Sequence, residues 1–409
     1  MGKKKRAVVS VLTLEANLKR KVRSHLRRLG FATANEGAIK PPSLAKEGIR
    51  ALHQEQRRSG LTSQKAFVLS ALPKLIKHFA DGSEVDPENI RPRLELVDAH
   101  TWQSDLFRLA SLSWSVPVSA GFGRRLRYLV WDANNDKLIG IIALGDPVFN
   151  LKVRDEAIGW NVNDRGKRLV DVLDAYVLGA VPPYNMLLGG KLVACLMRTK
   201  EVRDDFARKY GGSRGIISGK KKRAQLVMIT TTSALGRSSV YNRLKLGDQS
   251  YLQSIGYTQG WGHFHVPHSL FLELRGYLRK RKHQYVDGHR FGDGPNWRLR
   301  TIRAAFEALG FSPDLLRHGI GREVFVCHLA TNAAKVLRGE CKKAVYRGLK
   351  TVDEVGAFAR KRWLAPRAIR RPHYKDWRRS HFRDLVLNDR ARSQQRFASV
   401  EPPLQKQAA

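Results

Sequence analysis

The sequence predicts a mixed α/β fold of the α+β type, with basic helical extensions at both ends of a foldable core. Of the 409 residues, 42% are hydrophobic and 9% are aromatic, which is enough to build a packed core. Apolar, β-rich runs in the middle of the chain are followed by stretches with helical spacing, a succession typical of α/β domains. Positive charge is densest at the ends. Residues 1–60 hold 15 Lys and Arg against 4 Glu, and residues 341–409 hold 18 against 6 acids.

The N-terminal region, residues 1–98, is predicted to be helical and basic. Leu and Val recur every three to four positions over residues 13–29, which predicts an amphipathic helix capped by Thr13 and ended by Gly30. Residues 44–58 and 63–79 also show helical spacing. Prolines at 87 and 92 indicate a domain boundary before residue 100.

The central region, residues 99–285, is predicted to form the mixed α/β core. Residues 126–132 and 137–144 are apolar runs joined by Ala-Asn-Asn-Asp, which is typical of a β-hairpin. Residues 173–181 predict a further strand, residues 187–210 a helix, and residues 226–231 another strand. The alternation of strands and helices favours a mixed sheet covered by helices.

The C-terminal part is predicted to contain a small unit and a tail. In the unit, residues 286–345, Ser312-Pro313-Asp314 is a typical helix start, so residues 296–309 and 313–318 should form a helix–turn–helix-like pair. Residues 323–327 predict a short strand and residues 329–337 a helix. The tail, residues 346–409, is basic and aromatic, and we expect it to be partly mobile beyond about residue 385.

The charge balance indicates a polyanionic partner. The chain holds 75 Lys and Arg against 36 Asp and Glu, a net charge of +39. Binding to a phosphate backbone releases counterions and would relieve the self-repulsion of such a protein. A basic but merely solvated surface is the alternative. The sequence has no apolar run of about 18 residues and no secretory pattern. Its three scattered cysteines fit a reducing compartment, so we expect a cytoplasmic protein.

Basic clusters supply the candidate nucleic-acid contacts. The tail cations alternate with Trp, Tyr and Phe, a pattern that suits stacking on unpaired bases, although the same aromatics could anchor the tail on the domain. The polar stretch 230–243 follows a strand and is either a phosphate-binding loop or a helix entry capped by Ser238. The candidates are Lys19, Arg20, Arg23, Arg27, Arg28, Lys220, Lys221, Lys222, Arg237, Arg243, Arg279, Lys280, Arg281, Arg362, Arg370, Arg371, Arg378 and Arg379.

A glycine-containing turn between a predicted strand and a helix could hold a phosphate. It includes Gly189, Gly190 and Lys191, which are candidates for cofactor binding. The position resembles the acyl-CoA pyrophosphate loop of GNAT-type acyltransferases, and the preceding hairpin is similar to the same fold. The resemblance implies a GNAT-like core. The glycine spacing departs from that family's loop, so close packing of the helix on a strand is the competing interpretation.

Histidines and carboxylates supply the remaining catalytic candidates, which are His263, His265, Asp293, His318 and Glu323. His263 and His265 would share one face of a strand, an arrangement that some metal sites use, and carboxylates with His can support phosphodiester cleavage by divalent metals. No spacing fixes a complete ligand set. A structural role for these side chains is favoured, no metal site is assigned, and a divalent metal cofactor stays an open alternative.

Several separate stretches together resemble one family. They include Gly48-Ile-Arg-Ala-Leu-His, Val153-Arg-Asp-Glu-Ala-Ile-Gly-Trp160, Gly256-Tyr-Thr-Gln-Gly-Trp-Gly-His263, Phe291-Gly-Asp-Gly-Pro-Asn-Trp-Arg298 and Arg317-His-Gly-Ile-Gly-Arg-Glu323. In this order they resemble DruA-type proteins of the bacterial Druantia anti-phage system, over about residues 12–340. The resemblance implies a defence role alongside other system proteins, including a large helicase-like protein. It implies no catalytic residues.

The function predicted from these observations is a DNA-binding component of an anti-phage system. Single- and double-stranded DNA are both open as ligands, and a homo-oligomer is an open alternative to a monomer. Competing hypotheses are a metal-dependent nuclease, an acyltransferase, and a non-catalytic assembly subunit whose basic face meets acidic proteins.

Overall fold

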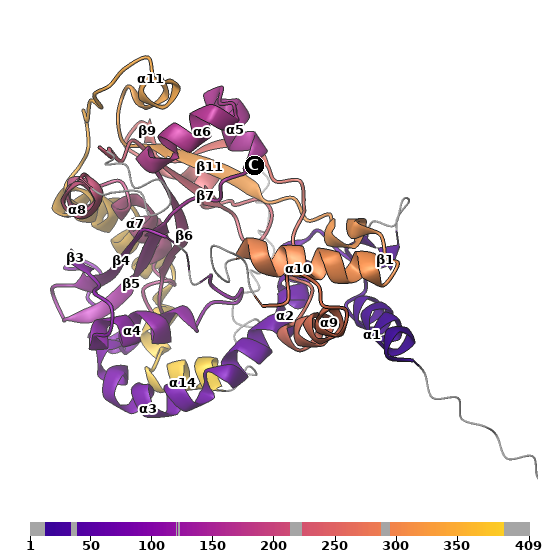
Figure 1. Cartoon of the computed structure of the whole chain (residues 1–409). Helices are drawn as coiled ribbons and strands as arrows, with labels where there is room; N and C mark the ends of the chain where they lie inside the picture. Colours follow the sequence, from indigo (N-terminus) through magenta and orange to yellow (C-terminus); the bar gives the residue numbers. More distant parts are fainter. Residues whose placement is uncertain are drawn as a thin grey trace, which may run out of the picture. The chain divides into compact units, whose positions relative to one another are not determined.

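The computed structural model describes residues 13–33, 39–119, 121, 123–212, 223–287 and 295–387. The chain divides into two compact units. We call the first, from Met1–Ser59 and Gln259–Arg322, the helical unit. We call the second, from Gly60–Thr258 and Glu323–Ala409, the sheet unit. Figure 1 shows the elements of both. Within the described ranges, no helix is long and apolar enough to cross a bilayer.

A seven-stranded mixed sheet forms the centre of the sheet unit, with strand order β10-β11-β7-β6-β5-β4-β3. Its neighbours pair antiparallel except β6 and β7, which run parallel and share three residue pairs. The mixed α/β class is therefore confirmed. A GNAT-like core stays a prediction, with which the parallel pair is compatible. The strands are β3 (Pro92–Leu96), β4 (Arg125–Asp132), β5 (Lys137–Gly145), β6 (Val172–Ala180), β7 (Met228–Thr232), β10 (Gln253–Tyr257) and β11 (Glu323–His328).

Both faces of this sheet are covered, which explains why the predicted hairpin is apolar throughout. Along β4, Tyr128 and Val130 enter one core, whereas Leu129 and Trp131 enter a second core on the opposite face. The first core is completed by α7 (Gly189–Leu196) and α12 (Val352–Ala359). The second is completed by α3 (Lys65–Leu75), α4 (Trp102–Ser111) and α14 (Ser380–Leu387), and Figure 1 shows α14 beside α3.

The helix predicted over residues 187–210 is two helices, α7 and α8 (Lys200–Tyr210). Between them, Thr199 forms an isolated bridge with Lys350, and the backbone N–H of Lys200 donates to the Lys350 carbonyl at 3.0 Å. A hydrogen bond to a distant segment thus replaces a helical one at this point. The remaining elements of the unit are α5 (Lys152–Ile158), α6 (Val162–Arg168), β8 (Lys245–Leu246), β9 (Gln249–Ser250), α11 (Ala333–Arg338) and α13 (Ala365–Arg370).

The helical unit is built around α1 (Leu14–Arg28), α9 (His268–Lys280) and α10 (Pro295–Ala308). Thr13 caps α1, as predicted, since its hydroxyl accepts the Ala16 N–H at 3.2 Å. Leu18 and Val22 of α1 share a core with residues of α9 and α10, and Figure 1 shows the indigo α1 beside the brown α9. β1 (Ala32–Thr33) pairs with β2 (Ile39–Lys40), and α2 (Lys46–Ser63) begins in this unit.

The second helix of the predicted helix–turn–helix-like pair is a short 3₁₀ turn, Pro313–Leu316. Ser312 caps it through the Asp314 N–H, but Arg317 leaves helical geometry. Four residues provide too few hydrogen bonds to offset the cost of nucleating an α-helix.

Candidate nucleic-acid interface

In the described part of the basic tail, up to residue 387, the aromatic side chains pack into the cores of the sheet unit, and most of the cations are exposed. Trp363, Trp377 and Phe382 are 7%, 3% and 0% exposed, and each belongs to one of the two cores that cover the sheet. Arg362, Arg370 and Arg378 are exposed. Of the two interpretations of this segment, aromatic anchoring is thus realised, and the arginines remain available to a ligand. Arg371 is half-buried.

Arg379 differs from its neighbours because it fastens the tail. Its side chain contacts Asp81 at 2.8 Å and Glu84 at 2.5 Å, and its backbone N–H donates to Asp81 at 2.6 Å. Burial alone would raise the pKa of Asp81, but the hydrogen bonds from Arg379 outweigh burial and hold that pKa below its ordinary value. Arg379 is therefore committed to internal ion pairs.

The polar loop after β7 is held in place by Glu323 at the start of β11. The Glu323 carboxylate accepts hydrogen bonds from the Ser238 N–H at 3.0 Å, Asn242 Nδ2 at 2.9 Å and Ser254 Oγ at 3.0 Å. Burial would raise its pKa, but these donors lower the pKa below its ordinary value. The carboxylate is thus an ionised anchor for a loop that presents Arg237 and Arg243 to solvent.

Three candidate cations from distant parts of the sequence converge at the start of α7. They are Lys191 on α7, Arg243 after the polar loop and Arg362 in the tail, and we call them the three-cation cluster. Burial lowers the pKa of Lys191, and the positive charges of Arg243 and Arg362 lower it further. The Lys191 ammonium also lies 5.5 Å from the Trp363 ring centroid. In the described part of the chain, none of the three forms an ion pair.

The two glycines before Lys191 differ in their surroundings. A Cβ atom on Gly189 would lie 2.6 Å from the Tyr184 carbonyl oxygen, so close packing requires glycine there. A Cβ atom on Gly190 would meet nothing within 4 Å. Gly189 therefore has the structural role that competed with phosphate binding, whereas Gly190 leaves open space beside the three-cation cluster.

In the helical unit His265 and His318 are buried and His263 is half-buried. His263 and His265 lie in an irregular segment before α9, so the prediction that they share one face of a strand is wrong. His265 Nε2 donates to the Leu315 carbonyl at 3.0 Å, and His318 Nδ1 accepts the Ile320 N–H at 3.2 Å. Burial is the largest cause that lowers the pKa of His263 and His265 to about 4 and that of His318 to about 3. These imidazoles are neutral at pH 7. Within the described residues, no group of three or more His, Cys, Asp or Glu could hold a metal ion.

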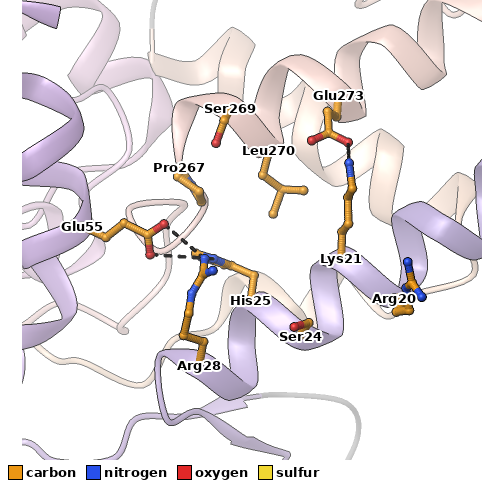
Figure 2. A pocket seen from close by; sticks show the side chains of 10 residues that line it. All are labelled: Arg20, Lys21, Ser24, His25, Arg28, Glu55, Pro267, Ser269, Leu270 and Glu273. Atoms are coloured by element: carbon orange, nitrogen blue, oxygen red, sulfur yellow. Dashed lines mark hydrogen bonds and ion pairs between the residues drawn. The ribbon is translucent and has the colours of Figure 1, made fainter. Parts of the chain in front are cut away.

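The basic face of α1 divides into paired and unpaired cations. A pocket of about 430 Å³ lies between α1 and the start of α9. Figure 2 shows it, with Lys21 reaching Glu273 at 2.5 Å and Arg28 reaching Glu55 at 3.2 Å. Lys19 pairs with Glu15 at 2.9 Å.

The unpaired cations of α1 are Arg20, Arg23 and Arg27, which we call the α1 arginine stripe. All three are exposed, and none has a carboxylate partner in the described ranges. Spacings of three and four residues place them on one face of the helix, along about 10 Å. The C-terminal end of α9 adds exposed Lys280 and Arg281, whereas Arg279 approaches Asp287 at 3.7 Å.

The structure thus distributes the predicted residues over several locations. His263, His265 and His318 lie in the helical unit, and Glu323 lies in the sheet unit with a structural role. Lys220, Lys221, Lys222 and Asp293 lie outside the described residues. Sequence patterns indicated each member of the three-cation cluster separately. No local pattern indicated that the three meet.

The fold and these surfaces define a basic α/β protein that presents uncompensated cations on both units. The chain matches the family described as Druantia protein DruA over residues 43–339. It is 55% identical to Druantia protein DruA of Escherichia coli strain UMEA 4076-1 over 389 residues, which covers 95% of this chain and 96% of that protein. The chain therefore belongs to the DruA family, and the predicted resemblance to DruA-type proteins of the Druantia anti-phage system is confirmed. No solved structure matches the chain.

Proposed function

We propose that this protein is the DNA-binding component of a Druantia anti-phage system. It would act in the bacterial cytoplasm together with other proteins of the system, a helicase among them. Family membership supports the defence role. The distribution of charge supports DNA as the ligand.

The three-cation cluster carries this proposal. Like charges repel, so bringing Lys191, Arg243 and Arg362 together is unfavourable unless an anion joins them. The lowered pKa of Lys191 reflects this repulsion together with burial. A phosphate group would neutralise the cluster and could also use the open space at Gly190.

The α1 arginine stripe supports the same ligand in the helical unit. Its guanidiniums have no competing carboxylates among the described residues, so contact with phosphates would not require breaking an ion pair. Arginine donates through a planar fork that matches phosphate oxygens. Phosphate contacts of this kind give affinity without sequence preference.

Fluorescence anisotropy with labelled duplex DNA tests the proposal. The variant Arg243→Glu/Arg362→Glu should lose about tenfold or more in affinity, and its log–log salt slope should fall by about 2, since each lost phosphate contact removes about 0.9. Lys65→Glu/Lys74→Glu on α3 is the matched control, because both lysines are exposed and the charge change is the same. Equal affinity of the two variants would contradict the proposal.

A further inference from the structure

A polar pocket of about 740 Å³ lies at the β10 edge of the sheet unit. Its lining includes Arg198 from the connection between α7 and α8, Gln249 on β9, Gln253 on β10 and His328 at the end of β11. The lining residues include one arginine and no carboxylate. The pocket volume falls within the usual range for sites that bind small molecules.

Arg198 is a buried cation without a counter-charge. The residue is only 5% exposed. Nε donates to the His328 carbonyl at 2.8 Å and Nη1 to Gln249 Oε1 at 3.1 Å, while the guanidinium carbon lies 4.9 Å from the Tyr251 ring centroid. All of these partners are neutral. Within the described ranges Arg198 has no carboxylate partner, and its remaining side-chain contact is with the neutral Tyr251 hydroxyl, so the buried charge is one that an anion would complete.

Carboxamides provide the second feature of this pocket. Gln249 uses its oxygen on Arg198 and keeps its NH₂ group, and Gln253 is exposed with no side-chain hydrogen bond in the described part of the chain. Asn242 donates to Glu323 and keeps its oxygen as an acceptor. Carboxamides offer donors and acceptors in the geometry that pairs with the edges of nucleobases.

We propose that this pocket binds a nucleoside phosphate, with the phosphate on Arg198 and the base on the carboxamides of Gln249 and Gln253. A phosphate supplies the missing negative charge, and a base supplies complementary donors and acceptors. A free nucleotide and the end of a DNA strand share this chemistry. The inference does not rest on the three-cation cluster or on the α1 arginine stripe.

Isothermal titration calorimetry of the full chain tests this pocket with the four 5′-deoxynucleoside monophosphates, the parent nucleosides and inorganic phosphate. At least one nucleotide should bind with Kd below about 1 mM. The corresponding nucleoside and inorganic phosphate should each bind at least about tenfold more weakly than that nucleotide. A 5′-phosphorylated tetranucleotide distinguishes the source. Tighter binding than the free nucleotide indicates a strand end, and weaker binding indicates a free nucleotide. Absence of binding by all nucleotides at about 5 mM would overturn the proposal.

Two variants locate the binding. Arg198→Gln should abolish nucleotide binding. Gln253→Glu changes an exposed side chain, so it tests the site even if the buried substitution prevents folding, and it should weaken binding about tenfold. Asn163→Asp on α6 makes the same amide-to-carboxylate change at an exposed position outside the pocket and should leave binding unchanged. If Gln253→Glu binds nucleotide as tightly as the parent protein, the assignment is wrong. Duplex-DNA affinity, measured in parallel, reports separately on the proposed function.

Discussion

Acidification is expected to loosen the helical unit selectively. His53 and His265 are 2% exposed and His318 is 4% exposed, and burial is the main cause that lowers their pKa values to about 4, 4 and 3. An imidazole in an unfolded chain has a pKa near 6.5. As the pH falls below this value, the unfolded state binds protons first. The stability is therefore complete above about pH 6.5 and is lost progressively towards pH 4.

The size of the effect follows from these pKa values. A pH of 5 lies about 1.5 units below the pKa of an unfolded imidazole, and one unit corresponds to about 1.4 kcal/mol. Each buried imidazole therefore lowers the free energy of unfolding at pH 5 by about 2 kcal/mol. That is a large fraction of the roughly 5–15 kcal/mol that stabilises a typical domain. In the sheet unit, burial lowers the pKa of His78 and His328 by less than in the three histidines of the helical unit, and it raises the pKa of Asp174 to about 6. A carboxyl whose pKa is raised on folding has the opposite effect, because stability increases as the pH falls through 6.

Hydrogen exchange measured by mass spectrometry at about pH 7.5 and pH 5, corrected for intrinsic rates, separates the two units. Protection in α9 and α10 should decrease at the lower pH, while protection in β4 and β5 should be retained. His265→Gln keeps a side-chain N–H for the Leu315 carbonyl but does not titrate, so it should reduce the acid sensitivity of the helical unit. Unchanged protection of α9 and α10 at pH 5, or an equal loss in both units, would refute the reasoning.

Three further predictions concern the cations and their anchors. Arg379→Ala leaves Asp81 without its ion-pair partner and leaves Glu84 with Lys137 alone, at 3.5 Å. The variant should therefore lower the free energy of unfolding by about 1–3 kcal/mol and speed proteolysis at α14, whereas Arg383→Ala, at an exposed position, should not. Glu323→Gln removes the charge that the loop donors bind, and it should weaken duplex-DNA binding several-fold in anisotropy without changing the far-UV circular dichroism. Reversing all three charges of the α1 arginine stripe should lower DNA affinity at about 50 mM salt with little change in Tm, and the difference should shrink at higher salt.

Local features of the sequence predicted the hairpin of β4 and β5 and the strands β6, β7 and β11, whereas the two edge strands, β3 and β10, were not predicted. The apolar runs of β4 and β5 and the turn between them are signals that lie within about 20 consecutive residues. α1 was likewise predicted with its Thr13 cap, because capping and helical spacing are local properties. Because both faces of the sheet are covered, its central strands are continuous apolar runs, and such runs are easy to recognise in the sequence.

Contacts between distant segments were beyond what one sequence shows. Leu18 shares a core with Leu274 and Phe306, which are 256 and 288 residues further along, and no pattern in either segment specifies that partner. The three-cation cluster and the unpaired buried charge of Arg198 were unpredictable for the same reason. Each depends on where the fold brings a side chain and on which acids are absent around it. Exposed cations are common in a chain of net charge +39, so composition alone does not distinguish them.

The salt dependence of duplex-DNA binding by the unmodified chain tests the central claim most directly. The three-cation cluster and the α1 arginine stripe together offer six cations, so if about half to all of them contact phosphates, log Kobs should fall linearly with log salt with a slope of about −3 to −5. Arg243→Glu/Arg362→Glu should make this slope shallower by about 2. DNA affinity that stays constant between about 50 and 200 mM salt, or the absence of binding at the lower concentration, would contradict the account.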